Sequence, residues 1–310
     1  MKQQITDTIL MVRPAHFGFN PTTAESNAFQ SNDTALSSEE IRLLAIQEFD
    51  QLVAKLYSAK IDVIVIEDTE DPIKYDAVFP NNWFSTHDDG SLVFYPMFSP
   101  MRRLERRPEI FEVLAETHHI NQRIHFEQFE TEDAFLESTG SIILDRPNNI
   151  GYACRSVRTN QKVVEAFCER MRCKAFFFDA VDVNEQLIYH TNVIMAIGET
   201  FVIMCMDSVK NGSEYVELLQ HFARTNKTLI EISLAQMECF AGNMLQVRNR
   251  DGETFLVMSE QAYQSLLPEQ IDLIEQHTNI LYSPVYIIEQ FGGGSVRCMM
   301  AEIFLPKKTS

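Results

Sequence analysis

Five polar or reactive residues stand at nearly equal intervals along the chain, each close to the start of an apolar run. They are Asn82, Glu137, His190, Asn243 and Cys298, separated by 55, 53, 53 and 55 residues. A cysteine, a histidine and a carboxylate are the residue types of an activated thiol nucleophile, in which a neighbouring base takes the thiol proton. A repeated fold that brought these positions to one axis would assemble such a site.

Each of these residues also has a structural interpretation. Cys298 follows the glycine run Gly292–Gly294, and glycine lets a backbone pass close to a ligand. A cysteine alone beside an apolar run is more often a small buried hydrophobe, and a lone histidine such as His190 is more often a satisfied core side chain. Glu137, at the mouth of an apolar strand, needs a partner. If the side chains of Cys298, His190 and Glu137 lie close together in the folded protein, the catalytic interpretation is favoured.

Hydrophobic periodicity predicts a recurring unit of strand, strand pair and helix. Helices are expected to begin near residues 41, 106, 160, 213 and 259, the first behind a capping box formed by Ser37 and Glu40. The unit is therefore about fifty residues long, a period that indicates repetition around an axis or along a solenoid. Five α/β units without a low-complexity linker predict one closed domain over residues 1–310.

The strands of these units are expected where apolar runs are short. They are residues 8–13, 62–66, 77–86, 92–95, 124–129, 141–144, 150–153, 175–178, 193–196, 201–204, 229–232, 244–247, 254–257, 281–288 and 298–304. The last of these would place Cys298 at the first position of a strand. The segment 16–38, in contrast, has no periodicity and is longer than most connections in compact domains. It forms either a cover over the site, with Phe17 and Asn20 against the substrate, or a plain surface excursion.

The formal net charge of −18 argues against nucleic acid or anionic lipid as a partner, because phosphates would be repelled. We expect no secretory signal in the first thirty residues and no membrane span, because no apolar run approaches the required length. The six cysteines show neither CxxC nor zinc spacing. Reduced thiols in a cytoplasmic protein are therefore predicted.

Several segments resemble the guanidine-modifying, or pentein, superfamily, which includes arginine deiminase, dimethylarginine hydrolase and glycine amidinotransferase. The segments are Leu136–Asp145 (LESTGSIILD), Ser156–Asn160 (SVRTN), His190–Asn192 (HTN) and the run around Cys298. The resemblance spans essentially the whole chain and implies a five-fold pseudosymmetric α/β propeller. MVRPAHFGFNPTTAESNAFQ and FPNNWFSTH look most like a bacterial subgroup of amidinotransferase-like hydrolases linked to citrulline use.

The resemblance also implies roles for individual residues. Cys298 would be the nucleophile, His190 the general acid and base, and Glu137 the carboxylate beside them. Arg158 would hold a substrate carboxylate, with Arg155 as a less well aligned alternative. No metal or organic cofactor is implied. The partner would be a small ureido or guanidino amino acid, and a homo-oligomer is possible.

The chain departs from arginine-handling relatives at two positions, where Asn82 and Asn192 replace aspartates. Two carboxylates suit a buried cation, whereas amides offer both donors and an acceptor to a neutral ureido group. With Asn243, these amides predict a citrulline hydrolase that forms ornithine, ammonia and carbon dioxide. The alternatives are a deiminase, dimethylarginine hydrolase or amidinotransferase acting on a guanidine, and a non-catalytic binding protein.

Overall fold

Five three-stranded mixed sheets make up the framework of the protein. A computed structural model describes residues 2–24, 27–32 and 34–308. In every sheet the middle strand pairs antiparallel with an inner strand and parallel with an outer strand. The fold is therefore the α/β propeller that the repeat and the resemblance indicated.

In the order inner, middle and outer, four sheets follow one another along the chain. They are β3 (Phe84–Thr86), β4 (Ser91–Phe94) and β5 (Gln122–His125); β6 (Ile143–Asp145), β7 (Ile150–Cys154) and β8 (Lys174–Phe178); β9 (Met195–Ile197), β10 (Phe201–Met204) and β11 (Thr228–Glu231); and β12 (Leu245–Arg248), β13 (Thr254–Ser259) and β14 (Asn279–Ser283).

Short turns join the inner and middle strands, and helices join the middle and outer strands, since a parallel pair needs a crossover connection. The crossover helices are α3 (Pro108–Thr117), α5 (Gln161–Met171), α6 (Gly212–Arg224) and the pair α8 (Glu260–Ser265) and α9 (Pro268–Glu275). Gly90 supplies the positive φ of 83° that the β3–β4 turn requires.

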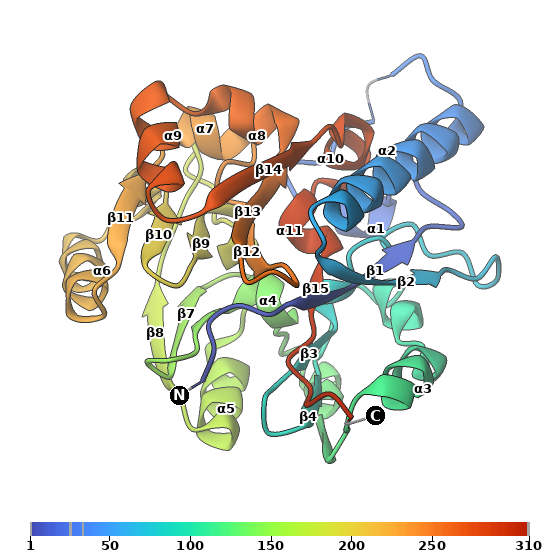
Figure 1. Cartoon of the computed structure of the whole chain (residues 1–310), viewed down its shortest axis with the longest axis horizontal. Coiled ribbons are helices and arrows are strands. Elements are labelled where there is room, and N and C mark those ends of the chain that lie inside the picture. Colours follow the sequence, from blue (N-terminus) through green and yellow to red (C-terminus); the bar gives the residue numbers. More distant parts are fainter. Residues whose placement is uncertain (1, 25–26, 33, 309–310) are drawn as a thin grey trace.

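The fifth sheet contains both ends of the chain. β15 (Ala301–Glu302) is its inner strand, β1 (Thr8–Arg13) its middle strand and β2 (Asp62–Glu67) its outer strand. Ile9 lies opposite Glu302, and Leu10 lies opposite Ala301. Figure 1 shows this contact between the blue and red ends of the chain. One closed domain over residues 1–310 accords with this pairing and stays a prediction.

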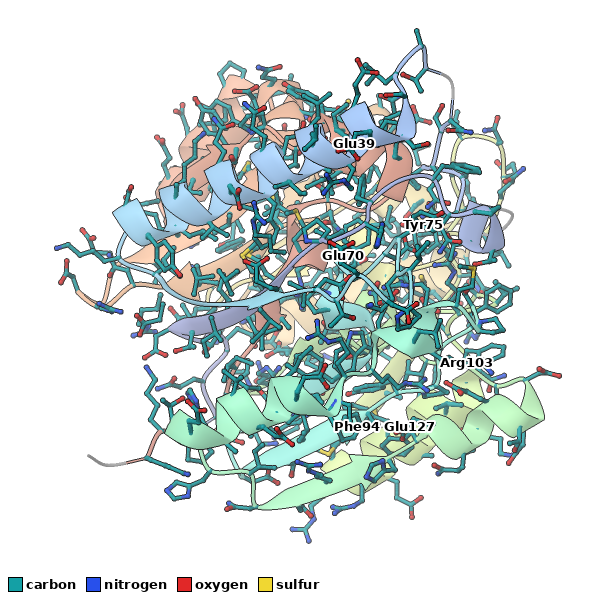
Figure 2. All side chains as sticks on the ribbon, turned by 90° about the vertical axis from the view of Figure 1, so that its right-hand side faces the viewer. Glu39, Glu70, Tyr75, Phe94, Arg103 and Glu127 are labelled. Atoms are coloured by element: carbon teal, nitrogen blue, oxygen red, sulfur yellow. The ribbon has the colours of Figure 1, made fainter. Side chains whose placement is uncertain are left out.

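The crossover helix of the fifth sheet is α2 (Ser38–Ser58), which lies across the outside of β1 and β2 (Figure 2). The predicted capping box holds its first turn: Glu40 N–H donates to Ser37 Oγ, and Ser37 N–H donates to the Glu40 carboxylate. Phe49 and Leu52 are fully buried on its inner face. None of the described helices is long and apolar enough to cross a membrane.

Apart from shifts of one or two residues at strand ends, four of the predicted strands are wrong in part. The strand expected at 77–86 is extended only over Phe84–Thr86, because Pro80–Asn82 form a 3-10 helix. Strand β14 ends at Ser283, before Pro284, and helix α10 (Tyr286–Gly292) follows. Cys298 lies in a short helix, α11 (Val296–Met299), and only Ala301–Glu302 of the predicted 298–304 strand is extended. The strand expected at 124–129 ends at His125. A short apolar run has the same composition in a buried helix and a buried strand, so periodicity alone does not separate them.

Aromatic side chains fill the space between α3 and the β3–β4 hairpin. The ring of Phe111 lies edge-on to Trp83, Phe84 and Phe94, with centroid distances of 5.1–5.6 Å. Phe111 is 1% exposed, so its ring contacts protein and almost no solvent.

We expect Phe111→Ala to lower the free energy of unfolding by about 3–5 kcal/mol, because it removes a buried ring and leaves a cavity. Urea unfolding followed by the fluorescence of Trp83, the one tryptophan of the chain, measures the change. Val113→Ala is the matched control, since Val113 lies on the same helix and is 41% exposed. Equal effects of the two substitutions would contradict the packing argument.

Candidate active site

The five equally spaced residues lie in equivalent places of the five sheets. Each stands in a turn or short helix that leads into the inner strand: Asn82 ends the 3-10 helix Pro80–Asn82, Glu137 precedes α4 (Ser138–Ser141), His190 precedes the 3-10 helix Thr191–Val193, Asn243 precedes β12, and Cys298 lies in α11. Helix α4 packs against both 3-10 helices, and α11 packs against the first. The repeat therefore brings these segments together.

A small cavity of about 10 Å³ lies among them, roughly the space of a single water molecule. Its lining combines predicted residues with others from the N-terminal segment and the glycine run: Thr23, Asn27, Asp76, Phe79, Asn82, Arg102, Arg158, Tyr189, His190, Gly292, Gly293, Gly294 and Cys298. Thr23 and Asn27 belong to the segment 16–38. Part of that segment is thus a wall of the cavity rather than a surface excursion.

Cys298 is 3% exposed and lies between two side-chain amides. Its Sγ accepts hydrogen bonds from Asn192 Nδ2 at 3.4 Å and from Asn243 Nδ2 at 3.3 Å. Asn192 and Asn243 therefore contact the thiol itself, and neither lines the cavity.

His190 and Glu137 form a buried pair. The distance from His190 Nε2 to Glu137 Oε2 is 2.8 Å, and both side chains are almost without exposure. An ionised carboxylate only accepts, so a neutral His190 donates its Nε2–H and keeps Nδ1 unprotonated. Burial lowers the pKa of His190 to about 4, although the hydrogen bond to Glu137 acts in the opposite direction. The imidazole is therefore a neutral base near pH 7.

Glu137 accepts from several directions, although it is fully buried. Its Oε1 accepts from the Phe98 N–H at 3.0 Å, and Arg158 Nη1 lies 3.5 Å from its Oε2. Burial alone would raise the pKa of Glu137, but the guanidinium of Arg158 and the hydrogen bond from His190 hold that pKa well below its usual range. Glu137 is thus a fixed negative charge beside His190.

Arg158 is 2% exposed and reaches from the Glu137 side into the cavity wall. Its Nη2 donates to the Thr23 carbonyl at 3.0 Å, and its guanidinium lies 4.9 Å from the ring centroid of Tyr189. Arg155, the alternative, instead pairs with Asp179 and Glu214 in a more exposed position and does not line the cavity. The structure brings Arg158, not Arg155, to the site.

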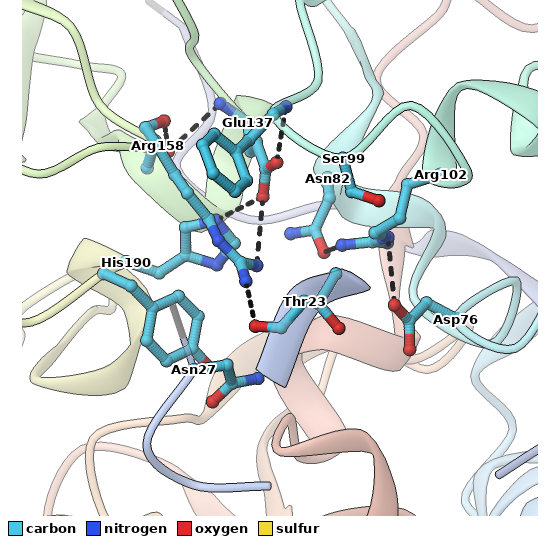
Figure 3. A network of polar contacts seen from close by, with 12 residues as sticks. Thr23, Asn27, Asp76, Asn82, Ser99, Arg102, Glu137, Arg158 and His190 are labelled. Carbon is cyan, nitrogen blue, oxygen red and sulfur yellow. Dashed lines mark hydrogen bonds and ion pairs between the residues drawn. The ribbon is translucent and has the colours of Figure 1, made fainter. Parts of the chain in front are cut away.

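A second charged group at the cavity was not predicted from the sequence. Arg102 donates through Nε and Nη2 to both oxygens of Glu105, each at 2.9 Å, and through Nη1 to Asn82 Oδ1 at 2.8 Å. Its Nε lies 3.6 Å from Asp76 Oδ2 (Figure 3). Burial raises the pKa of Glu105 to about 7, against the opposing charge of Arg102. Asp76 stands in a turn and Arg102 begins a 3-10 helix (Arg102–Glu105) too short for periodicity, and their charges alone would be typical of solvent-exposed residues.

Two predicted contact residues do not line the cavity. Asn20 is 1% exposed and donates through Nδ2 to Asp76 Oδ2 at 2.8 Å. Phe17 is buried in the core beside Gly292, where a Cβ would come within 3.3 Å of its ring. Asn27, which the prediction omitted, donates to the carbonyls of Gly292 and Gly293 at 3.3 and 3.2 Å. It joins the N-terminal segment to the glycine run.

Gly140 allows two of the site residues to approach. A Cβ at this position would lie 2.5 Å from Asn82 Nδ2 and 2.9 Å from His190 Nδ1. The Nδ2 of Asn82 and the Oδ1 of Asn192 are buried and have no hydrogen-bond partner among the residues that the structure describes. Buried polar atoms without partners are costly, so these two amides have capacity for a ligand. Within the described residues, no group of three or more His, Cys, Asp or Glu side chains could hold a metal ion.

Comparison with known proteins assigns the class. The chain belongs to the N,N-dimethylarginine dimethylhydrolase family, whose eukaryotic model matches residues 13–305. It is a hydrolase of this guanidino-group-modifying family, acting on C–N bonds other than peptide bonds. No curated protein sequence matches the chain significantly.

Solved structures share the fold at low sequence identity. The product-bound N-terminal domain of ArgZ, described as an arginine dihydrolase from the ornithine–ammonia cycle in cyanobacteria, has a TM-score of 0.72 and 16% identity, covering 96% of this chain and 99% of that domain. A dimethylarginine dimethylaminohydrolase variant with an S-methyl-L-thiocitrulline adduct has a TM-score of 0.64 and 14% identity, covering 97% and 100%. AgrE with ornithine and NAD⁺ has a TM-score of 0.75 and 15% identity, and this chain covers 40% of its length while 98% of this chain is matched.

We expect His190 to titrate near pH 4 in the protein without substrate, because its imidazole is buried. Histidine NMR signals followed against pH measure this, and loss of the signal in His190→Asn assigns it. Glu137→Gln should lower the midpoint further, since the carboxylate favours the charged imidazole.

The same depressed pKa makes folding weaker in acid. The unfolded chain takes up this proton near pH 6.5, so the contribution of His190 lowers the stability progressively as pH falls from about 6.5 towards 4. A titration midpoint of His190 at or above about 6.5 would contradict the buried neutral imidazole.

Proposed function

We propose that the protein hydrolyses the ureido group of citrulline, with Cys298 as the nucleophile. The observation that carries the proposal is the amide environment of the thiol: Asn192 and Asn243 both donate to Cys298 Sγ, and Asn82 lines the adjoining cavity. Amides match a neutral head group that has both N–H groups and a carbonyl. A guanidinium would call for carboxylates at these positions.

The amino-acid end of the substrate is proposed to bind between Arg158, Arg102 and Asp76. Two buried guanidiniums can hold a carboxylate through paired hydrogen bonds. Asp76 Oδ1 is buried and has no partner in the described part of the chain, so it can accept from an α-ammonium group. Asp76 was not among the residues predicted from the sequence, and it stands at another position than Asn82 and Asn192, which replace the aspartates of relatives. Asp76 supplies a carboxylate, but its other oxygen is held by Asn20 beside Arg102.

In the proposed mechanism the Cys298 sulfur attacks the ureido carbon, and His190 accepts the thiol proton. The C–N bond then breaks, and His190 returns the proton to the departing nitrogen, which leaves as a neutral amine or ammonia. Water, deprotonated by His190, attacks the thiocarbamate and releases Cys298. The carbamic acid that forms decomposes, so the overall products are ornithine, ammonia and carbon dioxide. Glu137 stabilises the transient imidazolium through its 2.8 Å hydrogen bond.

Substrate access is proposed to require movement of the segment that carries Thr23 and Asn27. The cavity of about 10 Å³ is far smaller than citrulline, and these two residues form part of its wall. Arg158 donates through Nη2 to the Thr23 carbonyl. A substrate carboxylate would compete with this carbonyl for the Arg158 guanidinium. Closure over a bound substrate would exclude water from the thiocarbamate until the amine has left.

A guanidine substrate is the second candidate. It is favoured by the buried carboxylates of Asp76 and Glu137 and by ArgZ, a protein of the same fold that is described as an arginine dihydrolase.

The six cysteines are free in the described structure, and we propose a reducing, cytoplasmic location for the protein. We propose that neither a metal nor an organic cofactor takes part.

The purified protein should be incubated separately with citrulline, arginine, dimethylarginine and agmatine, with ammonia and the amine product measured. We expect ammonia and ornithine in equal amounts from citrulline, and no turnover by Cys298→Ala. Turnover of arginine alone would reject the ureido assignment, and full activity of Cys298→Ala would reject the nucleophile. Dependence on added glycine would indicate an amidinotransferase.

Asn82→Asp and Asn192→Asp should each move the preference from citrulline towards arginine, because they restore a carboxylate beside the head group. We expect kcat/KM for citrulline to fall at least about tenfold, the order of one charge-assisted hydrogen bond. The ratio of the two kcat/KM values is the measurement. Asn148→Asp is a matched control, since Asn148 binds Asp145 outside the cavity. An unchanged ratio in both site variants would refute the amide argument.

A further inference from the structure

A cavity of about 610 Å³, far larger than the catalytic one, lies at another place in the fold. It is bounded by the N-terminal residues, the β3–β4 turn, the β6–β7 turn and the end of α5. The elements β4 and α5 lie in the lower part of Figure 1. The lining residues are Lys2, Gln3, His87, Asp88, Asp89, Gln122, Leu144, Asp145, Arg146, Asn149, Ile150, Phe167, Arg170, Met171, Arg172, Cys173 and Phe304. Its volume is within the usual range of small-molecule sites, roughly 300–1,000 Å³.

This cavity lies at the opposite ends of two inner strands from the catalytic residues. Asn82 comes before β3, and His87 follows it. Glu137 comes before β6, and Arg146 follows it. The two cavities have no lining residue in common. The larger one is therefore a separate site.

Arg146 is a buried cation without an ion-pair partner among the described residues. Its exposed fraction is 9%, and no carboxylate of the described chain lies within ion-pair distance of its guanidinium. The guanidinium stacks on Phe304, 3.8 Å from the ring centroid, and has one long contact of 3.4 Å to His87 Nδ1. The nearby carboxylate of Glu302 is paired with Arg297 instead, at 2.8 Å.

His87 does not compensate this charge. Its Nε2 lies 2.9 Å from Ser85 Oγ. Burial and the charge of Arg146 hold the pKa of His87 well below its usual range, so the imidazole is neutral. A buried charge is costly without a counter-charge, and a guanidinium has five N–H donors in a fork that fits planar oxyanions. Arg146 thus has both the charge and the donors to hold an anion.

The other charges of the lining are mixed. Lys2, Arg170 and Arg172 are further cations, whereas Asp88, Asp89 and Asp145 are anions. Two of the three carboxylates already accept internal hydrogen bonds, Asp145 from Asn148 and Asp89 from the Ser91 N–H. The lining therefore has one more cation than anions in a chain whose net charge is −18. Leu144, Ile150 and Phe167 add an apolar wall.

We propose that this cavity binds a small molecule with a carboxylate or phosphate group on an apolar body, and that Arg146 holds the anionic group. The ring of Phe304 supports the guanidinium from one side and leaves its N–H edges available. The site is independent of the reaction assigned to Cys298. A planar apolar body would pack against the wall formed by Leu144, Ile150 and Phe167.

Isothermal titration of the full chain with phenyl phosphate, benzoate, inorganic phosphate and neutral benzamide tests the proposal and separates the two anion types. We expect at least one of the two aromatic anions to bind with 1:1 stoichiometry, and benzamide, which has no charge, to bind at least about tenfold more weakly. Arg146→Gln should weaken the binding of that anion at least about tenfold, the order of one hydrogen bond to a charged group. Arg224→Gln is the matched control: it removes the same charge from an exposed position on α6 and should leave binding within about twofold.

Arg146→Lys keeps the test decisive should Arg146→Gln fail to fold. It retains the charge but lacks the planar fork, so it should weaken the binding of the same anion several-fold. Circular dichroism and the turnover measured with the wild-type substrate would check that each variant is folded, since Arg146 does not line the catalytic cavity. The proposal fails if neither aromatic anion binds the wild-type protein. It also fails if the folded Arg146 variants bind as the wild type does.

Discussion

Pairing of the two ends of the chain is the constraint on which the remainder of the structure depends. β15 and β1 are almost 300 residues apart in sequence order, yet they form one sheet with β2. This pairing completes the ring of five sheets and brings α11, with Cys298, against the 3-10 helix that ends at Asn82. Without it the thiol would have no fixed relation to the histidine and carboxylate supplied by the middle of the chain.

Closure also explains why the site is so strongly buried. Turns from all five sheets fill the axis, so charged groups there have lost their water and need partners from neighbouring sheets. Glu137 has His190, Arg158 and the Phe98 N–H, and Arg102 has Glu105, Asp76 and Asn82. Burial destabilises charged groups at this site, and for the same reason it keeps His190 neutral. A general base must be neutral to accept a proton at neutral pH.

The inner strands of the repeated sheets border two different cavities, one at each of their ends. At the start of the inner strands, polar turns point to the axis and make the cavity that contains Cys298. At the other end of β3 and β6, the following residues His87 and Arg146 border a cavity of quite different chemistry. It has an apolar wall and a cation, Arg146, that forms no ion pair with any described residue. Family membership concerns the chemistry at the cavity that contains Cys298. The substrate assays and the asparagine variants test that chemistry.

The sequence by itself determined the periodic part of the protein. Regular spacing of Asn82, Glu137, His190, Asn243 and Cys298, together with five amphipathic helices, predicted the number of units and the equivalence of these positions, because repeats of one unit fold alike. Only the tertiary structure decided what lies outside the period. Asp76 is in a turn and Arg102 in a short 3-10 helix, where no pattern distinguishes a buried charge from a solvated one. Helix α11 is likewise too short for periodicity to separate helix from strand. The unpaired state of Arg146 likewise depends on which side chains the closed ring places around it, and sequence distance does not encode that.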